Sequence, residues 1–394
     1  MRKGLVLVGG RRTPMAEYNG ELAHLSAVDL GVHASRAVLD QTGVEPGQVD
    51  HVVFGNVLQT CEDAIYLARH IGLRTGIPVE VPALTVNRLC GSGFQAIVSG
   101  AHMLLLDEAS VVLAGGTESM SQAPYAVRGA RQGLRLGHAP FVDTLMESLY
   151  DNYCKLPMAV TAENLAERWS ISREDQDRLA IRSQRTAEEA RRAGRLADEV
   201  APVPLKDKRK GEVLFDEDTH RKPESTFETL SKLRPAFRKE GSVTGGNASG
   251  IVDGAAATVV TKEETAARHG WPVLGFLRGW SYSAVDPSIM GFGPVPAIQK
   301  LLKAEGLTKD QVDLFEINEA FAAQYLACEK ALELDREKVN VNGGAIALGH
   351  PLGATGTRLV ITLLYEMRRR GVRFGVASAC IGGGQGMALL LERA

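Results

Sequence analysis

A cysteine in a glycine-rich turn is the first candidate for chemistry. Cys90 stands in the stretch 87–93, Asn-Arg-Leu-Cys-Gly-Ser-Gly, at the end of an expected buried strand and before apolar residues that recur at helical spacing. A thiol there lies beside unpaired backbone N–H groups and the positive end of a helix dipole, and both favour the thiolate. We therefore expect Cys90 to be a nucleophile. The alternative is a small buried hydrophobic residue, which is the common role of a free cysteine.

Two further glycine-rich turns carry a histidine and a second cysteine. His350 lies between Gly349 and Pro351 in a loop that leads into a helix. Its imidazole could take the proton of Cys90 and stabilise the thiolate as an ion pair. Cys380 precedes three glycines between two expected strands, and such a turn exposes backbone N–H groups that suit an oxyanion hole. A structural loop histidine and a tight turn with a buried cysteine are the plainer alternatives.

A fourth candidate is Asn318, at the end of a strand expected over 312–317. Its side chain could hold a water or donate a hydrogen bond, whereas the neighbouring Glu319 could equally be a helix N-terminal charge. Two thiols, an imidazole and an amide suit carbon–carbon chemistry on an acyl group. One thiol carries the acyl group as a thioester, and a second group moves a proton alpha to a carbonyl. The residue types alone do not identify the carrier of the acyl group.

The elements that must position these residues alternate between strands and helices up to about residue 120. Strands are expected over 5–8, 49–57 and 111–116, and helices over 28–39, 63–73 and 94–106. Such alternation predicts α/β layers around a mainly parallel sheet. The all-apolar run 111–116 is typical of a central strand covered on both faces.

The composition changes over residues 121–242, where charges are dense and prolines frequent. Helices are expected over 161–169 and, behind Ser172 as the N-cap, over 173–193. We interpret the segment as an inserted region of helices and loops whose charges lie mainly in solvent.

An internal repeat connects the two ends of the chain. Residues 43–50 match 306–313, each after an amphipathic helix and before a strand, and residues 84–87 match 339–342, each before a glycine-rich turn and a helix. Two matches in the same order predict duplicated α/β halves. Because such halves place corresponding turns near a common pseudo-twofold axis, we expect the Cys90 turn to lie near the turn that contains the histidine.

Composition excludes several classes of protein. The chain has 394 residues, and 45 Lys and Arg against 47 Asp and Glu give a net charge of −2, which argues against nucleic acid as a partner or a membrane surface as a site of action. Five cysteines without CxxC spacing argue against a disulfide framework or a thiolate metal site, so no metal is expected. No apolar run approaches a membrane span, and the first residues read as a strand. We expect a cytoplasmic protein, or one of the mitochondrial matrix in a eukaryote, without membrane insertion.

The motifs together resemble the thiolase family over essentially the whole chain. They are the segment 87–93, Gly115-Gly116-Thr-Glu118-Ser-Met, Asn318-Glu-Ala-Phe321, Gly349-His350-Pro351 and Cys380-Ile-Gly-Gly-Gly384. Residues 63–70, 156–164 and 286–291 are most similar to mitochondrial-type 3-ketoacyl-CoA thiolases and their bacterial relatives. The resemblance implies CoA-dependent cleavage of a 3-ketoacyl-CoA to acetyl-CoA and a shortened acyl-CoA, as in fatty acid β-oxidation.

The resemblance also implies an architecture. The thiolase fold consists of two duplicated α/β halves stacked as a five-layered αβαβα core with an inserted loop domain. We expect residues 1–120, completed by 243–270, to form the N-terminal half and 271–394 the C-terminal half. Residues 121–242 would form the domain over the CoA site. The family forms homo-oligomers, so we expect a dimer or, preferably, a tetramer.

The family's catalytic roles fall on residues already singled out. Cys90 attacks the 3-keto carbonyl and becomes acylated, and Cys380 exchanges the proton with the acetyl-CoA carbanion. His350 activates Cys90 and, with a water held by Asn318, forms one oxyanion hole. The N–H groups of Cys90 and Gly382 form the other hole. We expect the pKa of both thiols to lie below the free value of about 8.5.

The family's CoA site falls by position on Lys222, Ser225 and Ser249, with CoA as a co-substrate and no cofactor. Relatives usually carry Arg before the proline at 223, whereas this chain has Lys222 preceded by Arg221. Lysine meets a phosphate as a point charge but lacks the planar surface that stacks on an adenine. For Lys222 and Ser225 the alternative therefore stays open that they are polar surface residues without a part in CoA binding.

Other activities stay open beside cleavage. The same residues suit an acetyl-CoA acetyltransferase working in the condensing direction, and water attack on an acylated Cys90 would give acyl-CoA hydrolysis. A decarboxylating ketoacyl synthase generally uses a second histidine near Asn318, so the pair of Asn318 and Cys380 argues against it. A non-catalytic lipid-binding relative is disfavoured because all four catalytic stretches, which contain Cys90, Asn318, His350 and Cys380, are intact.

Overall fold

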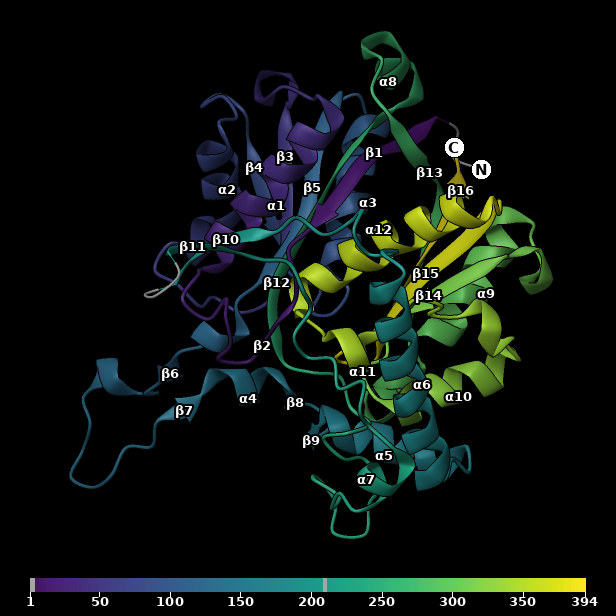
Figure 1. Cartoon of the computed structure of the whole chain (residues 1–394). Helices are drawn as coiled ribbons and strands as arrows, with labels where there is room; N and C mark the ends of the chain where they lie inside the picture. Colours follow the sequence, from purple (N-terminus) through teal and green to yellow (C-terminus); the bar gives the residue numbers. More distant parts are fainter. Residues whose placement is uncertain (1–3, 208–210) are drawn as a thin grey trace.

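One ten-stranded sheet runs through the molecule and joins the two ends of the chain (Figure 1). The computed structural model describes residues 4–207 and 211–394. The strands in order across the sheet are β14 (Leu314–Ile317), β15 (Phe374–Ile381), β16 (Gln385–Arg393), β13 (Val273–Ala284), β1 (Leu5–Arg12), β12 (Val252–Lys262), β5 (Val111–Glu118), β3 (His51–Gly55) and β4 (Ala83–Val86), with β2 (Ala16–Glu17) beside one end of β12.

The sheet is built from two similar halves that meet at the antiparallel pair β1 and β13. In one half, β3 and β5 form a parallel pair, and β12 pairs with β5 in the antiparallel direction on the side toward the centre of the sheet. In the other half, β14 and β15 form the parallel pair, and β16 takes the place of β12. Phe315 of β14 forms a parallel bridge to Val339, at the position that β4 takes beside β3. The predicted duplication into two α/β halves is therefore confirmed.

The repeated segments also have the same local structure. Helix α1 (Ala27–Thr42) ends at Gly43 with a φ of 69°, and helix α9 (Pro294–Glu305) ends at Gly306 with a φ of 68°. A left-handed glycine stops a helix because only glycine adopts this conformation without steric cost. A short 3-10 turn then leads into the next strand in both halves.

The expectation of a mainly parallel sheet is wrong. Only β4, β3 and β5, and β14 with β15, run in parallel, and the other pairs are antiparallel. β15 and β16 must be antiparallel because a tight turn at 382–384 connects them, in which Gly383 and Gly384 have positive φ. The strand before Cys90 is also not buried: β4 is the edge strand, and Leu84 is 40% exposed.

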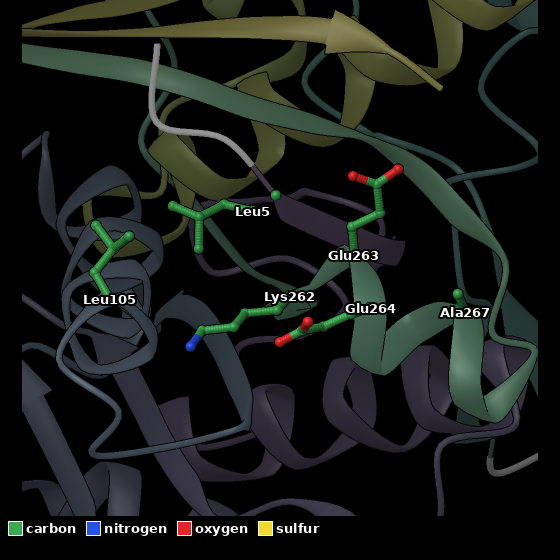
Figure 2. Close-up of a pocket in the computed structure, with 7 residues that line it drawn as sticks. Leu5, Leu105, Lys262, Glu263, Glu264 and Ala267 are labelled. Atoms are coloured by element: carbon green, nitrogen blue, oxygen red, sulfur yellow. The ribbon is translucent and has the colours of Figure 1, made fainter.

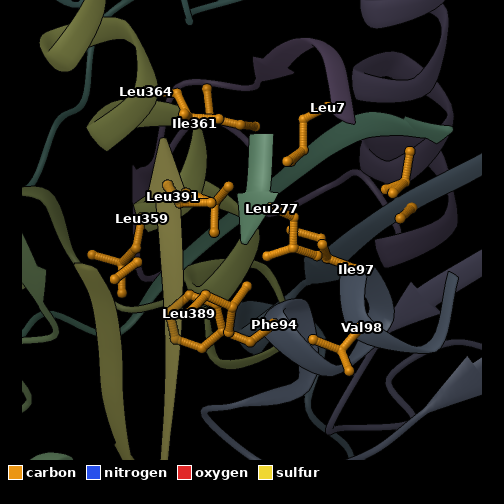
Figure 3. Close-up of a cluster of buried hydrophobic side chains, with 14 of the residues drawn as sticks. Leu7, Phe94, Ile97, Val98, Leu277, Leu359, Ile361, Leu364, Leu389 and Leu391 are labelled. Carbon is orange, nitrogen blue, oxygen red and sulfur yellow. The ribbon is translucent and has the colours of Figure 1, made fainter. Parts of the chain in front are cut away.

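Helices and half-sheets alternate in five layers. α3 (Ser92–Leu105) and α12 (Leu352–Arg370) pack on each other between the half-sheets, and Figure 3 shows Phe94, Ile97, Leu359 and Ile361 in this central core. α1 and α2 (Leu67–Thr75) cover the outer face of one half, and α9 and α10 (Ala322–Leu332) cover that of the other. α12 is buried on all sides over most of its length, as expected for a helix between two sheets.

The inserted region contains the two predicted helices, α5 (Met158–Arg168) and α6 (Arg173–Arg192). Ser172 caps α6 in a reciprocal arrangement with Asp175, as the sequence predicts. The inserted region also contains α4 (Thr144–Ser148), α7 (Phe227–Ser231), β6 (Tyr125–Ala126), β7 (Val142–Asp143), β8 (Tyr150–Asp151), β9 (Leu156–Pro157), β10 (Val203–Asp207) and β11 (Gly211–Phe215). Two short helices lie outside it, α8 (Glu263–His269) and α11 (Ala345–Leu348).

An arm formed by β6, β7 and α4 projects from the body (Figure 1). We keep 121–242 as the proposed limits of the inserted domain. Among the helices that the structure describes, none combines the length and the apolar character that a membrane crossing requires.

Candidate active site

Cys90 lies in a constrained turn between β4 and the N-terminus of α3. The preceding Leu89 has a φ of 47°, a left-handed conformation that is costly for a residue with a Cβ. Its N–H donates to Asn87 Oδ1 at 2.9 Å, and its carbonyl accepts from Ser92 Oγ at 2.7 Å. Ser92 Oγ also accepts from the N–H of Arg88 at 2.8 Å. Side chains within the turn therefore hold the thiol in place.

The Cys90 thiol faces the turn between β15 and β16. Burial raises its pKa to about 11, because a thiolate would lose its hydration. Hydrogen bonds from the backbone N–H groups of Gly382 and of Cys90 itself act in the opposite direction. Both N–H groups that the family resemblance assigns to one oxyanion hole thus lie at this sulfur.

Cys380 is fully buried at the end of β15, in a small apolar cluster with Met158, Met290 and Ala320. Burial raises the pKa of its thiol well above the ordinary value, and a charge on Cys90 would raise it further. The expectation of lowered thiol pKa values is therefore wrong for the ligand-free protein. The helix terminus and the N–H groups do not offset the loss of hydration at these buried positions.

The histidine is held in one tautomer by its neighbours. The hydroxyl of Thr355 donates to the carbonyl of Pro351 at 3.0 Å, so it accepts from His350 Nδ1, 2.6 Å away. The lone pair of the imidazole is then on Nε2, which faces Asn318 Nδ2 at 3.3 Å. The backbone N–H of His350 donates to the carbonyl of Gly250 at 2.9 Å. The ring therefore presents a basic nitrogen beside Asn318.

His350 is neutral in the ligand-free protein. Burial, followed by the positive charge of Arg358, lowers the pKa of its imidazole to about 3. An imidazole with this pKa does not take a proton from a thiol whose pKa is about 11, so the expected resting ion pair between Cys90 and His350 is wrong. The two groups start as a neutral thiol and a neutral base, and the proton moves when the thiol attacks.

We expect alkylation of Cys90 by iodoacetamide to be slow at neutral pH and to accelerate as the pH rises toward 11. Only the thiolate reacts, and a raised pKa lowers the thiolate fraction at any given pH. The measurement is the alkylation rate of the Cys90 peptide between pH 6 and 11, followed by mass spectrometry, with N-acetylcysteine as the reference thiol. A rate that already reaches its plateau below pH 8 would show that the thiol is activated at rest.

The residues expected to bind CoA separate into two places. The N–H of Ser249 donates to the carbonyl of Ala320 at 3.0 Å, so Ser249 adjoins the turn that carries Asn318. Lys222 and Ser225 lie on an outer turn of the inserted region, where the N–H of Ser225 donates to the carbonyl of Lys222. The ammonium of Lys222 lies 3.3 Å from a carboxylate oxygen of Glu17.

The two residues before Lys222, His220 and Arg221, both contact other parts of the chain. The guanidinium of Arg221 is engaged by Glu188 and Glu217, so it does not take the place of the arginine common in relatives. The ring of His220 lies against Gly250, where a Cβ would overlap it. His220 thus connects the outer turn to the segment that carries Ser249. This contact could not be predicted from the sequence, because a histidine and a glycine 30 residues apart form no motif and only the folded chain brings them together.

The structure thus brings most of the predicted residues together. One group contains Cys90, Cys380 and Gly382, the adjoining group contains His350, Asn318 and Ser249, and Lys222 and Ser225 lie on the outer turn. Sequence reasoning assigned no role to Thr355 or to Glu118, which both contact the histidine loop. Among residues 4–207 and 211–394, no cluster of three His, Cys, Asp or Glu side chains could hold a metal ion.

A separate cavity has a volume of about 550 Å³. Figure 2 shows the residues that line it. It is bordered by Leu5, Leu105, Lys262, Glu263 and Glu264. These residues gather at the end of β12 opposite to the end that pairs with Glu118. The cavity therefore takes no part in the chemistry of the two cysteines.

Family models match nearly the whole chain: the thiolase N-terminal domain over residues 5–264 and the thiolase C-terminal domain over residues 271–393. The chain belongs to the thiolase family. It is 52% identical to the mitochondrial 3-ketoacyl-CoA thiolase of Homo sapiens, over 99% of this chain and 98% of that protein. It is 48% identical to an acetyl-CoA acetyltransferase of Pseudomonas aeruginosa, over 99% of each chain.

A solved structure extends the likeness to three dimensions. The crystal structure of the human mitochondrial 3-ketoacyl-CoA thiolase in complex with CoA superposes with a TM-score of 0.96 at 51% identity, covering 100% of this chain and 98% of that chain. The thiolase fold expected from the sequence is therefore confirmed.

Proposed function

We propose that this member of the thiolase family is an acyltransferase that cleaves 3-ketoacyl-CoA with CoA, as in fatty acid β-oxidation. The observation that carries the proposal is that these groups form one site. The Cys90 thiol accepts a hydrogen bond from the Gly382 N–H and lies near the buried Cys380. The neutral His350 and its partner Asn318 lie on adjoining loops. A nucleophile, a separate proton donor and two sets of oxyanion donors are the parts that a Claisen-type cleavage needs.

In the first half-reaction, Cys90 attacks the 3-keto carbonyl while His350 accepts the thiol proton at Nε2. The bond between C2 and C3 then breaks, and Cys380 gives its proton to the carbanion, which leaves as acetyl-CoA. In the second half-reaction, CoA gives its thiol proton to the Cys380 thiolate and attacks the acyl-Cys90 thioester. Cys90 leaves with the proton that His350 held, and the product is an acyl-CoA that is two carbons shorter. Asn318 Oδ1, buried without a hydrogen-bond partner among the described residues, would hold the water of one oxyanion hole. The N–H groups of Cys90 and Gly382 would form the other.

The alternative is an acetyl-CoA acetyltransferase that works in the condensing direction, and the similarity to the Pseudomonas aeruginosa protein of that name supports it. Thiolysis of acetoacetyl-CoA and of 3-ketoacyl-CoA substrates of increasing length distinguishes the two. We expect turnover of the longer substrates. Cleavage of acetoacetyl-CoA alone would favour the alternative, and release of free acid without CoA consumption would indicate hydrolysis.

We expect Lys222→Ala to raise KM for CoA about fivefold and to leave kcat within about twofold, because one half-exposed charge contributes about 1 kcal/mol to binding a phosphate. Lys262→Ala is the matched control, since Lys262 lies at the remote end of β12 and pairs with Asp107. The measurement is thiolysis at varied CoA concentration. An unchanged KM in Lys222→Ala would show that the Lys222 ammonium makes no contact with CoA.

We also propose that the chain forms a homo-oligomer, a dimer or a tetramer. Two features support this proposal: the unpaired edge of β4 within the described sheet, and the projecting arm, on which Leu134, Leu136 and Phe141 are exposed. Light scattering after size-exclusion chromatography tests it. For the compartment, we propose the cytoplasm, or the mitochondrial matrix if the source is eukaryotic, and the mitochondrial name of the human relative supports the second of these.

A further inference from the structure

Glu118 is a buried carboxylate to which the catalytic scheme gives no role. It ends β5 and accepts four hydrogen bonds: from the N–H groups of Val57, Leu58 and Gly353 at 3.1, 2.9 and 2.8 Å, and from Asn56 Nδ2 at 3.0 Å. The bond from Gly353 crosses between the halves, because Gly353 opens α12, three residues after the histidine. One carboxylate of the N-terminal half therefore fixes the downstream end of the His350 loop.

Glu319 is a second buried carboxylate, on the upstream side of the same loop. Its oxygens accept from Ser183 Oγ at 2.7 Å, from Asn340 Nδ2 at 2.9 Å and from the N–H of Ile346 at 3.3 Å. Ile346 lies in α11, four residues before His350. The carboxylate therefore connects the turn after β14 and helix α6 to the short helix that leads into the loop.

Glycines permit a close approach at each of the two anchors. A Cβ on Gly344 would overlap the carboxyl group of Glu319, and a Cβ on Gly116 would overlap the carbonyl of Gly353. A glycine at 344 thus lets a buried acid reach the backbone before the histidine, and a glycine at 116 lets β5 pack directly on the backbone after it. The two anchored N–H groups, of Ile346 and Gly353, are separated by residues 347–352, which include His350.

We propose that Glu118 and Glu319 are positioning residues that hold the His350 loop from its two sides and thereby set the imidazole against Cys90. The two catalytic groups belong to different halves of the fold, and the Glu118 contact to Gly353 crosses that boundary beside them. A catalytic group displaced by about 1 Å loses about 100-fold in rate. The proposal rests on the function proposed above, because it acts through His350.

The test is Glu118→Gln. One oxygen of Glu118 accepts from Asn56 and Leu58, and the other accepts from Val57 and Gly353. Whichever of the two becomes the NH₂ group of glutamine would face two N–H donors, so the substitution disrupts the network that holds the loop while side-chain volume is kept. We expect kcat to fall about 30- to 100-fold, with KM for CoA within about threefold. Glu392→Gln is the matched control: this buried carboxylate pairs with Arg278 and Arg373 at the far end of β16. It should lose stability to urea but keep kcat.

Coupling to the histidine separates positioning from general loss of structure. In a His350→Ala background, Glu118→Gln should cause no further fall in the residual rate of acetyl-CoA release, because the group that it positions is gone. A fall of the same size in both backgrounds, or a kcat within twofold of wild type in Glu118→Gln, would overturn the proposal.

A milder variant serves if Glu118→Gln does not fold. Ser183→Ala removes one donor to Glu319 and one acceptor from the N–H of Gly344 without changing a buried charge. We expect kcat to fall about three- to tenfold, and an unchanged kcat would count against the Glu319 anchor. The wild-type rate is measured alongside: absent thiolysis in wild type refutes the proposed function, whereas active wild type with unaffected variants refutes only the positioning role.

Discussion

Cys90→Ala is expected to lower kcat for thiolysis by at least about 10⁴-fold, because no other group at the site can carry the acyl chain. Cys380 is the other thiol of the site, but it is buried among Met158, Met290 and Ala320, and burial raises its pKa well above the ordinary value. Substrate binding should persist, since the N–H group of Gly382 and the CoA contacts are retained. The measurement is the rate of acetyl-CoA release from a 3-ketoacyl-CoA at saturating CoA.

The matched control for this prediction is Cys154→Ala. Cys154 is a free, half-buried thiol in the turn between β8 and β9, outside both groups of site residues. It should leave kcat unchanged. A Cys90→Ala protein that retains more than about a tenth of the wild-type rate would mean that another group is the nucleophile.

Cys380→Ala is expected to separate the two halves of the chemistry. Removing a general acid and base costs about 10²- to 10⁴-fold in the overall rate, and the exchange of α-protons of acetyl-CoA with deuterated water should fall by the same factor. Transfer of an acyl group from an acyl-CoA to Cys90 needs no α-proton, so exchange of labelled CoA into acyl-CoA should persist.

Both readouts come from one mixture analysed by mass spectrometry, with Cys328→Ala as the control. Cys328 is a buried thiol behind Cys380 that donates to the carbonyl of Gly291. Its replacement should leave α-proton exchange within about threefold of wild type. Deuterium exchange that survives in Cys380→Ala would place the base elsewhere, and loss of CoA exchange as well would show that Cys380 also supports acylation.

The neutral state of the site could not be predicted from the sequence. The position of Cys90 before a helix indicated a lowered pKa, yet burial raises the pKa of the thiol to about 11 and lowers that of His350 to about 3. Sequence shows which dipoles and N–H groups are near a residue, whereas desolvation depends on the whole packed environment. The tautomer of His350 likewise depends on Thr355, five residues away, whose role only the geometry reveals.

The fold was more accessible to sequence reasoning than the site. The match of 43–50 to 306–313 predicted the duplication, because each half repeats a helix, a left-handed glycine and a strand. Strand directions were harder to predict. Alternation of helices and strands indicated parallel pairing, but β12 arrives after the inserted region and β16 after a tight hairpin, and both run antiparallel to their neighbours. The direction in which a strand pairs with a distant one is not visible in the local periodicity of apolar residues.

The roles of Glu118 and Glu319 illustrate the same limit. Both stand in motifs that the sequence singles out, but their partners include the backbone N–H groups of Gly353 and Ile346, which any residue type except proline could supply. Only the packed structure shows that two carboxylates of different halves reach one loop.

Trapping of the acylated protein tests the central claim most directly. The wild-type chain is mixed with a 3-ketoacyl-CoA in the absence of CoA, quenched in acid, digested and mapped by mass spectrometry. The account predicts one acyl group, shorter than the substrate by two carbons, on the peptide that contains Cys90, and its disappearance when CoA is added before the quench. An acyl group on Cys380, or acetyl-CoA release without any acylated peptide, would contradict it.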